Sequence, residues 1–261
     1  MRLCGQELVS RPHASIAIEP HSNFSPRINH QHLSQHNMSS SIKPLVLHAH
    51  GTGPNPYKIA AALEFLNLPY EVKLWQFGDA ANGVKGPEFL KINENGRVPA
   101  LEDPNTGVTS WESGAVMNYL LRVYDKENKL GPRGSSEQDR VDFEKWEYFL
   151  LSTLGPMMGQ VNWFRHYHSS KNEDALQRYE EQAYRCFGVI DAQIKKTGDK
   201  FVLPGSTPTA VDLHVYPWVY QHSYAGLSLD SYPSTKKWLE NVSALKEIKA
   251  AYEKVPKGKE M

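Results

Sequence analysis

The sequence predicts an α/β domain followed by an all-helical domain. Short apolar runs alternate with a helical repeat over residues 43–125. Glycine and proline then gather in residues 126–136, and the repeats beyond them are all helical. We therefore expect one domain over 43–125, a linker over 126–136 and a helical domain over 137–261.

The first 42 residues are rich in Ser, Asn, Gln and His and show no apolar periodicity. This composition is typical of a disordered segment, so we expect a disordered leader over residues 1–42. Few acidic residues occur in it, as in transit peptides, but no amphipathic face accompanies them. We therefore expect no targeting role and a cytoplasmic protein.

The first domain opens with a βαβ unit. Residues 45–47 are an apolar run, which predicts a buried strand, and residues 50–56 form a turn-rich loop. Asn55 and Pro56 suit the N-cap and first position of a helix. A second strand is expected over 70–75. The helical spacing between them is carried by Ile59, Ala62, Leu63 and Leu66.

A short helix over 87–92, strands over 98–101 and 108–111, and a helix beginning near Glu112 complete this domain. The resulting order, βαβ, short α, ββα, is that of a thioredoxin-like domain.

In the second domain the helical repeats cover residues 137–154, 173–197, 209–225 and 234–252. Thr209 and Asp212 have the spacing of a capping box, in which two side chains satisfy free N–H groups reciprocally. We assign both residues a structural role.

Charge and composition exclude several classes of function. The 261 residues include 29 basic and 29 acidic ones, a net charge of zero, which disfavours nucleic acid as a partner. No run approaches the roughly 20 apolar residues of a membrane-spanning helix. Cys4 and Cys186 form no CxxC motif, and His48 and His50 lack a third ligand nearby, so we expect no metal centre.

Three clusters carry chemical information. In residues 53–58 a strand leads to a helix N-terminus, whose free N–H groups and dipole favour a phosphate or a thiolate. Alternatively, Asn55 only caps its own helix. In the second cluster, Arg97-Val98-Pro99, a cis Val98–Pro99 bond would expose backbone groups to a peptide-like ligand, although a trans edge proline is commoner.

The third cluster is Trp111-Glu112-Ser113-Gly114 at the next helix start. Ser113 can bind a carboxylate and Glu112 an ammonium, which together suit an α-amino acid group. Alternatively, Glu112 only complements the helix dipole.

These segments resemble the glutathione transferase superfamily. The resemblance covers about residues 44–252 and is carried by GPNPYKIAAALEFLNLPYE, PEFLKINENGRVPALED and WESGAVMNYL. It is strongest for the fungal nitrogen-regulator-like branch and the bacterial Nu class, because GPMMGQVNWFRHYHSS at 155–170 is specific to that branch.

The resemblance implies a glutathione site. Val98, in a segment with Arg97 and a cis Pro99, would bind the cysteinyl backbone, and Glu112 with Ser113 the γ-glutamyl end. Asn55 would face the sulfur. Many relatives place Tyr, Ser or Cys there, whereas this loop holds Gly53 and Asn55 and no cysteine. Mixed-disulfide chemistry is therefore disfavoured, and the hydroxyls of Thr52 and Tyr57 are the other candidates.

For the second substrate we expect an apolar electrophile between the domains. Met157, Met158, Trp163 and Phe164 are the candidate contacts, because they flank a Gly-Pro pair at which a helix is expected to open. The family is usually dimeric, which implies a homodimer.

The sequence thus predicts a glutathione transferase, with a specialised fungal pathway implied by the branch. Two alternatives stay open. One is a glutathione-dependent double-bond isomerase working by thiol addition and elimination, and the other is a non-catalytic regulator or scaffold.

Overall fold

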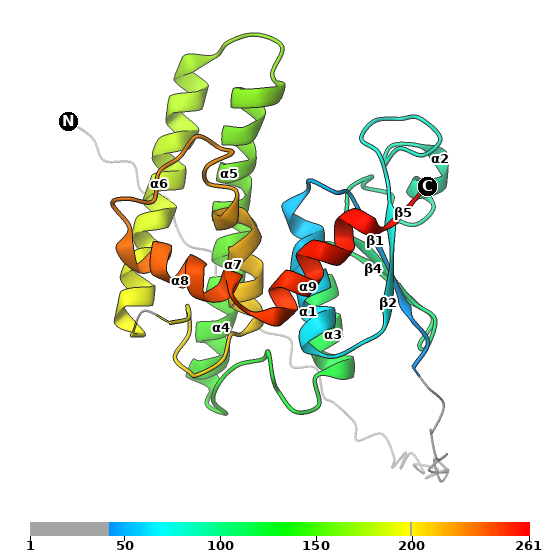
Figure 1. Cartoon of the computed structure of the whole chain (residues 1–261), viewed down its shortest axis with the longest axis horizontal. Helices are drawn as coiled ribbons and strands as arrows, with labels where there is room; N and C mark the ends of the chain where they lie inside the picture. The colour runs from blue at the N-terminus through cyan, green and yellow to red at the C-terminus, as the bar shows by residue number, and fades with distance from the viewer. Residues whose placement is uncertain (1–41, 199) are drawn as a thin grey trace, which may run out of the picture. The chain divides into compact units, whose positions relative to one another are not determined.

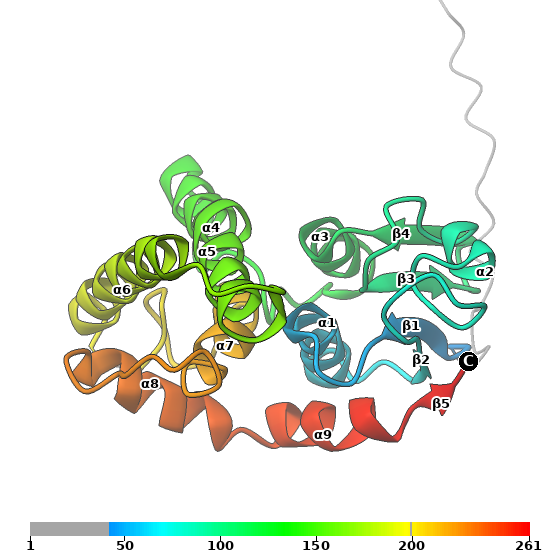
Figure 2. The same cartoon turned by 90° about the horizontal axis from the view of Figure 1, so that it is seen from above.

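The computed structural model describes residues 42–198 and 200–261. The predicted leader, apart from Ile42, lies outside these residues. A five-stranded sheet carries helices α1 (Pro54–Phe65) and α3 (Ser113–Tyr124), which lie between it and most of the helical domain (Figures 1 and 2), while the short α2 (Pro87–Leu90) follows a loop. The strands are β1 (Leu45–Ala49), β2 (Tyr70–Leu74), β3 (Ala100–Asp103), β4 (Val108–Trp111) and β5 (Lys259–Glu260).

Strand order in the sheet is β4-β3-β1-β2-β5. β1 pairs in parallel with β2 and antiparallel with β3, and β3 pairs antiparallel with β4. This mixed sheet, with its βαβ unit and ββα end, is the predicted thioredoxin-like arrangement. It brings the start of α1 and the residues before β3 to neighbouring positions, where the predicted clusters lie.

Helix α1 begins earlier than the sequence predicts. Its N-cap is Gly53 and its first residue is Pro54, so Asn55 lies inside the first turn and does not cap the helix. Pro54 favours this start because proline has the φ of the first helical position and no N–H group that would need a partner there. The apolar face of α1 is fully buried, with Ile59 and Leu63 inaccessible to solvent.

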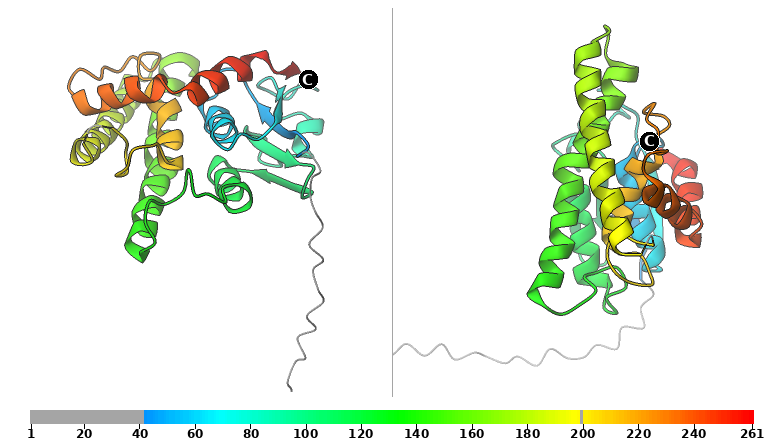
Figure 3. Two further views of the ribbon diagram at one scale, coloured as in Figure 1. Left: turned by 60° about the horizontal axis from the view of Figure 1, so that its bottom comes forward. Right: turned by 90° about the vertical axis from the view of Figure 1, so that its left-hand side faces the viewer.

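The second domain is helical, and its long helices run side by side in Figure 3. Its elements are α4 (Glu137–Phe149), η1 (Leu150–Leu154), α5 (Gly155–Asn162), η2 (Trp163–Tyr167), α6 (Glu173–Lys196), α7 (Ala210–Tyr220), α8 (Pro233–Ser243), α9 (Lys246–Lys254) and η3 (Val255–Lys257).

The helix predicted to open at Gly155-Pro156 does not open. Residues 137–167 are helical without interruption, and the turns η1 and η2 within them are π-helical. Pro156 is accommodated because it lies in the first turn of α5, next to the wider π turn of η1, where its missing N–H costs little.

The helix predicted over 234–252 is instead two helices. α8 ends at Ser243 and α9 begins at Lys246, because Leu245 has an extended backbone. The change of direction lets α9 return along α1 toward the sheet, where β5 pairs with β2 (Figure 2). β5 was not predicted, since a strand of two residues has no detectable alternation.

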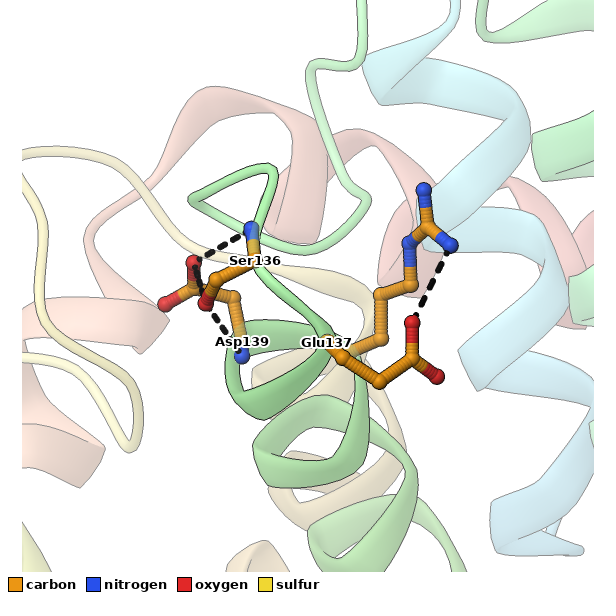
Figure 4. A network of polar contacts seen from close by, with 4 residues as sticks. Ser136, Glu137 and Asp139 are labelled. Carbon is orange, nitrogen blue, oxygen red and sulfur yellow. Dashed lines mark hydrogen bonds and ion pairs between the residues drawn. The ribbon is translucent and has the colours of Figure 1, made fainter.

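Two capping boxes begin helices of this domain. At α7, the carboxylate of Asp212 accepts hydrogen bonds from the N–H and the hydroxyl of Thr209, at 2.8 and 3.1 Å. At α4, Ser136 Oγ accepts from the N–H of Asp139 at 3.1 Å, and Asp139 accepts from the N–H of Ser136 (Figure 4). Thr209 and Asp212 therefore have a structural place in the fold.

Candidate functional site

A cleft of about 720 Å³ lies between the two domains. It is lined from α1, the segment before β3, α3, the α4–α5 helix and α7. All six residues predicted to bind glutathione line it, although they come from three separate segments. The residues are Asn55, Arg97, Val98, Pro99, Glu112 and Ser113.

Asn55 offers two hydrogen-bond donors at the start of α1, its backbone N–H and its side-chain NH₂ group. Its neighbours Pro54 and Pro56 have no N–H group, so among the first three helical residues only Asn55 can donate from the backbone. Its side-chain Oδ1 accepts a hydrogen bond from Trp218 Nε1 at 3.1 Å. An anion at this helix end would therefore meet Asn55 first.

The two hydroxyls considered beside Asn55 are engaged elsewhere. Tyr57 donates to the carbonyl oxygen of Gly51 at 2.6 Å, and its ring lies 4.3 Å from that of Tyr252. The hydroxyl of Thr52 is hydrogen-bonded to His50 Nδ1 at 3.1 Å. Neither residue lines the cleft, whereas Asn55 does.

The second segment is held by a buried asparagine. Asn93, only 1% exposed, donates to the carbonyl oxygen of Arg97 at 2.5 Å and accepts from the N–H of Asn95 at 2.9 Å. The Val98–Pro99 peptide bond is cis, as the resemblance implied. Asn93 thus fixes the turn that presents Val98 and Pro99 to the cleft.

Glu112 has an unusual backbone. Its φ of 68° lies in the left-handed region, which residues with a Cβ rarely adopt. Ser113 follows as the first residue of α3, where backbone N–H groups lack helical partners. At Gly114 a Cβ would lie 2.6 Å from Leu151 Cδ1, so this glycine permits close approach of α3 to η1.

Lys58 is a cleft residue that the sequence reasoning missed. Its side chain is 1% exposed, and Nζ donates to Ser113 Oγ at 3.4 Å. Burial lowers the pKa of Lys58 to about 7, although the carboxylates of Glu112 and Glu147 favour its charged form. The helical spacing places Lys58 on the same face of α1 as Asn55, and this could have revealed it.

Behind Lys58 lie two further buried titratable groups. Glu147 of α4 is 2% exposed, and its Oε1 lies 3.3 Å from Nε2 of the fully buried His214 of α7. Asn118 donates to the other carboxylate oxygen at 3.3 Å. Burial lowers the pKa of His214, which favours its neutral form. The buried carboxyl group of Glu147 thus lies beside His214 and acts electrostatically on Lys58.

Of the four residues predicted to contact the second substrate, Trp163 lines the cleft and is 49% exposed. Met158 is fully buried in the core, and the ring of Phe164 stacks on Tyr179 at 5.6 Å. Met157 is half-buried outside the cleft lining. The continuous helix turns these last three side chains away from the cleft. The sequence analysis did not identify four residues that do line it, Tyr148, Leu151, Gln160 and Trp218.

No group of three or more His, Cys, Asp or Glu side chains in residues 42–198 and 200–261 is arranged to hold a metal ion. His48 is occupied otherwise, since its Nδ1 accepts from Trp75 Nε1 at 3.0 Å and its Nε2 lies 2.9 Å from Glu102. In the same described part of the chain, every helix is too short or too polar to span a membrane.

Comparison with known proteins gives the same assignment for both domains. Residues 43–122 match the glutathione S-transferase N-terminal domain family, and residues 154–246 match the C-terminal domain family. The glutathione S-transferase-like protein gedE of Aspergillus terreus is 35% identical, over 80% of this chain and 95% of its own. Protein URE2 of Candida albicans is 28% identical, over 88% of this chain and 76% of its own.

Solved structures agree with the sequence matches. The glutathione transferase URE2P6 of Phanerochaete chrysosporium, crystallised with oxidized glutathione, superposes with a TM-score of 0.75. It is 33% identical, over 82% of this chain and 97% of its own. Both domain matches, the thioredoxin-like sheet and the helical second domain show that this chain belongs to the glutathione S-transferase family.

Proposed function

We propose that this protein is a glutathione transferase that activates the thiol of glutathione for attack on an apolar electrophile. The observation that carries the proposal is the convergence of Asn55, Val98, Glu112 and Ser113 in one cleft. Each group suits one part of glutathione: Asn55 the thiol, Val98 the peptide backbone, and Glu112 with Ser113 the amino acid end.

The amino acid end of glutathione would lie at the start of α3. Its carboxylate would accept from Ser113 and from the N–H groups of the first helical turn, with the Lys58 ammonium behind Ser113. Its ammonium would lie against Glu112. Val98, beside Arg97 and Pro99, would pair with the cysteinyl backbone.

The thiol would lie at the start of α1. Donation from Asn55 and the positive end of the helix dipole both favour the thiolate over the thiol. A hydrogen bond to a charged group contributes about 1.5–3 kcal/mol. Loss of the Asn55 side chain is therefore expected to raise the pKa of the bound thiol by about 1–2 units.

The electrophile would lie on the other side of the thiol. Trp163, Tyr148 and Leu151 offer flat and aliphatic surface there, and the first two are 49% and 60% exposed. Because the matched relatives named above are fungal, we place the reaction in a specialised fungal pathway. We further propose a cytoplasmic homodimer, as the family resemblance implies.

Calorimetry with glutathione tests the proposal, comparing the wild type with Asn55→Ala and following the bound thiol by thiolate absorbance. We expect similar affinity in both proteins and a higher thiol pKa in the variant. If the wild type fails to bind glutathione, both enzymatic functions are excluded and a scaffold role remains.

The product assay separates the two enzymatic functions. Conjugation consumes one glutathione for each substrate and yields a thioether. Isomerisation adds the thiolate to a conjugated double bond and later eliminates it, so that glutathione is regenerated. Consumption of glutathione in step with substrate supports conjugation, whereas turnover at constant glutathione supports isomerisation.

A further inference from the structure

Trp218 of α7 lies against the residue that would face the sulfur. Its ring nitrogen Nε1 is 3.1 Å from Asn55 Oδ1, although the two residues are 163 positions apart in the chain. The ring is half-buried and lines the same cleft. Trp218 therefore links the helical domain directly to the start of α1.

The chemistry of this contact determines how the Asn55 amide is turned. An indole nitrogen carries a hydrogen and can only donate, so its partner on Asn55 must be the carbonyl oxygen and not the NH₂ group. With Oδ1 occupied by Trp218, the amide nitrogen is the polar atom left for the cleft. The contact thus distinguishes the two orientations of a side chain whose ends have nearly the same shape.

The orientation matters because the two ends of the amide act oppositely on a thiolate. An NH₂ group donates to the anion and stabilises it, whereas a carbonyl oxygen turned toward it would repel it. An asparagine that rotates freely samples both orientations. A fixed donor needs no reorganisation when the thiolate forms.

The packing around the indole supports a fixed position. At Gly155 of α5 a Cβ would lie 3.2 Å from Trp218 Nε1, so this glycine leaves the space that the ring edge occupies. Lys58 Nζ of α1 lies 6.0 Å from the ring centroid. The ring therefore lies against both α5 and α1, with its N–H directed at Asn55.

We propose that Trp218 is a positioning residue that turns the Asn55 amide so that its NH₂ group donates to the thiolate of bound glutathione. The proposal rests on the proposed function, since it concerns the same thiol. It predicts that thiol activation depends on a residue of the helical domain that would not itself touch the sulfur.

The first measurement needs no glutathione. In nitrogen–proton NMR spectra of the unliganded protein, we expect the Trp218 indole N–H resonance to move upfield and exchange faster with water in Asn55→Ala. An unchanged resonance would show that the hydrogen bond does not form in solution and would overturn the proposal. This measurement stands even if the Trp218 variant does not fold.

The second measurement is the pKa of the bound thiol in Trp218→Phe, which keeps an aromatic ring but lacks the N–H. We expect a rise of about one unit, a tenfold lower ratio of thiolate to thiol, with glutathione affinity changed less than about threefold. The double variant should show the same thiol pKa as Asn55→Ala alone, because without the Asn55 amide Trp218 has no donor to position. Trp146→Phe, a core tryptophan of α4, should leave the thiol pKa unchanged.

The outcomes separate this proposal from the proposed function. Binding of glutathione with a wild-type thiol pKa in Trp218→Phe would overturn the positioning role alone. A rise in Trp218→Phe that adds to that of Asn55→Ala would also overturn it, because the two residues would then act independently. Failure of the wild type to bind glutathione would overturn both.

Discussion

Trp163 and Phe164 are neighbours in the chain, yet they lie in different surroundings. Trp163 is 49% exposed on the cleft, while Phe164 is half-buried against Tyr179 of α6. Successive residues of a helix project in different directions around its axis, which places the two side chains on different sides of η2. This adjacent pair therefore provides a substitution and its matched control.

We expect Trp163→Ala to raise KM for an apolar electrophile about 5–30-fold, because burying an aromatic surface on a substrate is worth about 1–2 kcal/mol. The dissociation constant for glutathione should stay within about twofold. Phe164→Ala should lower stability without the increase in KM. Steady-state kinetics with a model electrophile and thermal unfolding measure both effects, and equal KM changes in the two variants would contradict the placement.

Site residues that belong to a local sequence motif could be predicted, whereas those that reach the cleft only through tertiary packing were missed. Asn55, Val98 and Ser113 are recognisable from local motifs, and all three line the cleft. Trp218 reaches it only because α7 packs on α1, a contact between distant segments. Met158 is of a residue type that often lines pockets, but its position on the helix directs its side chain into the core.

At the scale of elements, the two capping boxes have the same residue spacing in unlike environments. Asp212 is fully buried and, besides Thr209, accepts from the N–H of Val202 and from Trp238 Nε1, each at 2.9 Å. Asp139 completes the capping box of α4 with the exposed N-cap residue Ser136 (Figure 4). The same residue type at the same helix position therefore has a different number of buried donors to satisfy.

We expect Asp212→Ala to lower the free energy of unfolding by at least about 3 kcal/mol, since each buried donor left without a partner costs about 1–3 kcal/mol. Asp139→Ala should cost about 1 kcal/mol, the usual loss of a helix cap. Urea unfolding of the two variants gives the comparison. Losses of equal size would show that the buried network around Asp212 adds nothing to a simple cap.

Element boundaries show what periodicity can and cannot predict. The helix over 173–197 was confirmed nearly to the residue, because α6 has one continuous apolar face ending in Ile190 and Ile194. The break between α8 and α9 was missed, since both helices carry the same repeat and Leu245 changes only the backbone. A change of direction leaves no mark on hydrophobic spacing.

At the scale of the whole molecule, Lys58 connects the two domains. It lies on α1 and faces Ser113 and Glu112 at the start of α3, Glu147 of α4 and, through Glu147, His214 of α7. Sequence alone predicts the order of the domains but not this buried group of charges, because its members are far apart in the chain. The protonation of Lys58 is therefore linked to the folding of both domains.

This linkage predicts how stability depends on pH. The pKa of Lys58 is about 7 in the folded protein and 10.5 without burial, so between these values the unfolded chain binds more protons and the free energy of unfolding rises with pH. The free energy of unfolding of the wild type, measured in urea, should therefore rise relative to that of Lys58→Met by about 1 kcal/mol per pH unit from pH 7.5 to 9.5. Lys145→Met, at a lysine 55% exposed on α4, is the control and should show no such slope. Parallel stability curves for wild type and Lys58→Met would mean that Lys58 stays charged in the fold, held by Glu112 and Glu147.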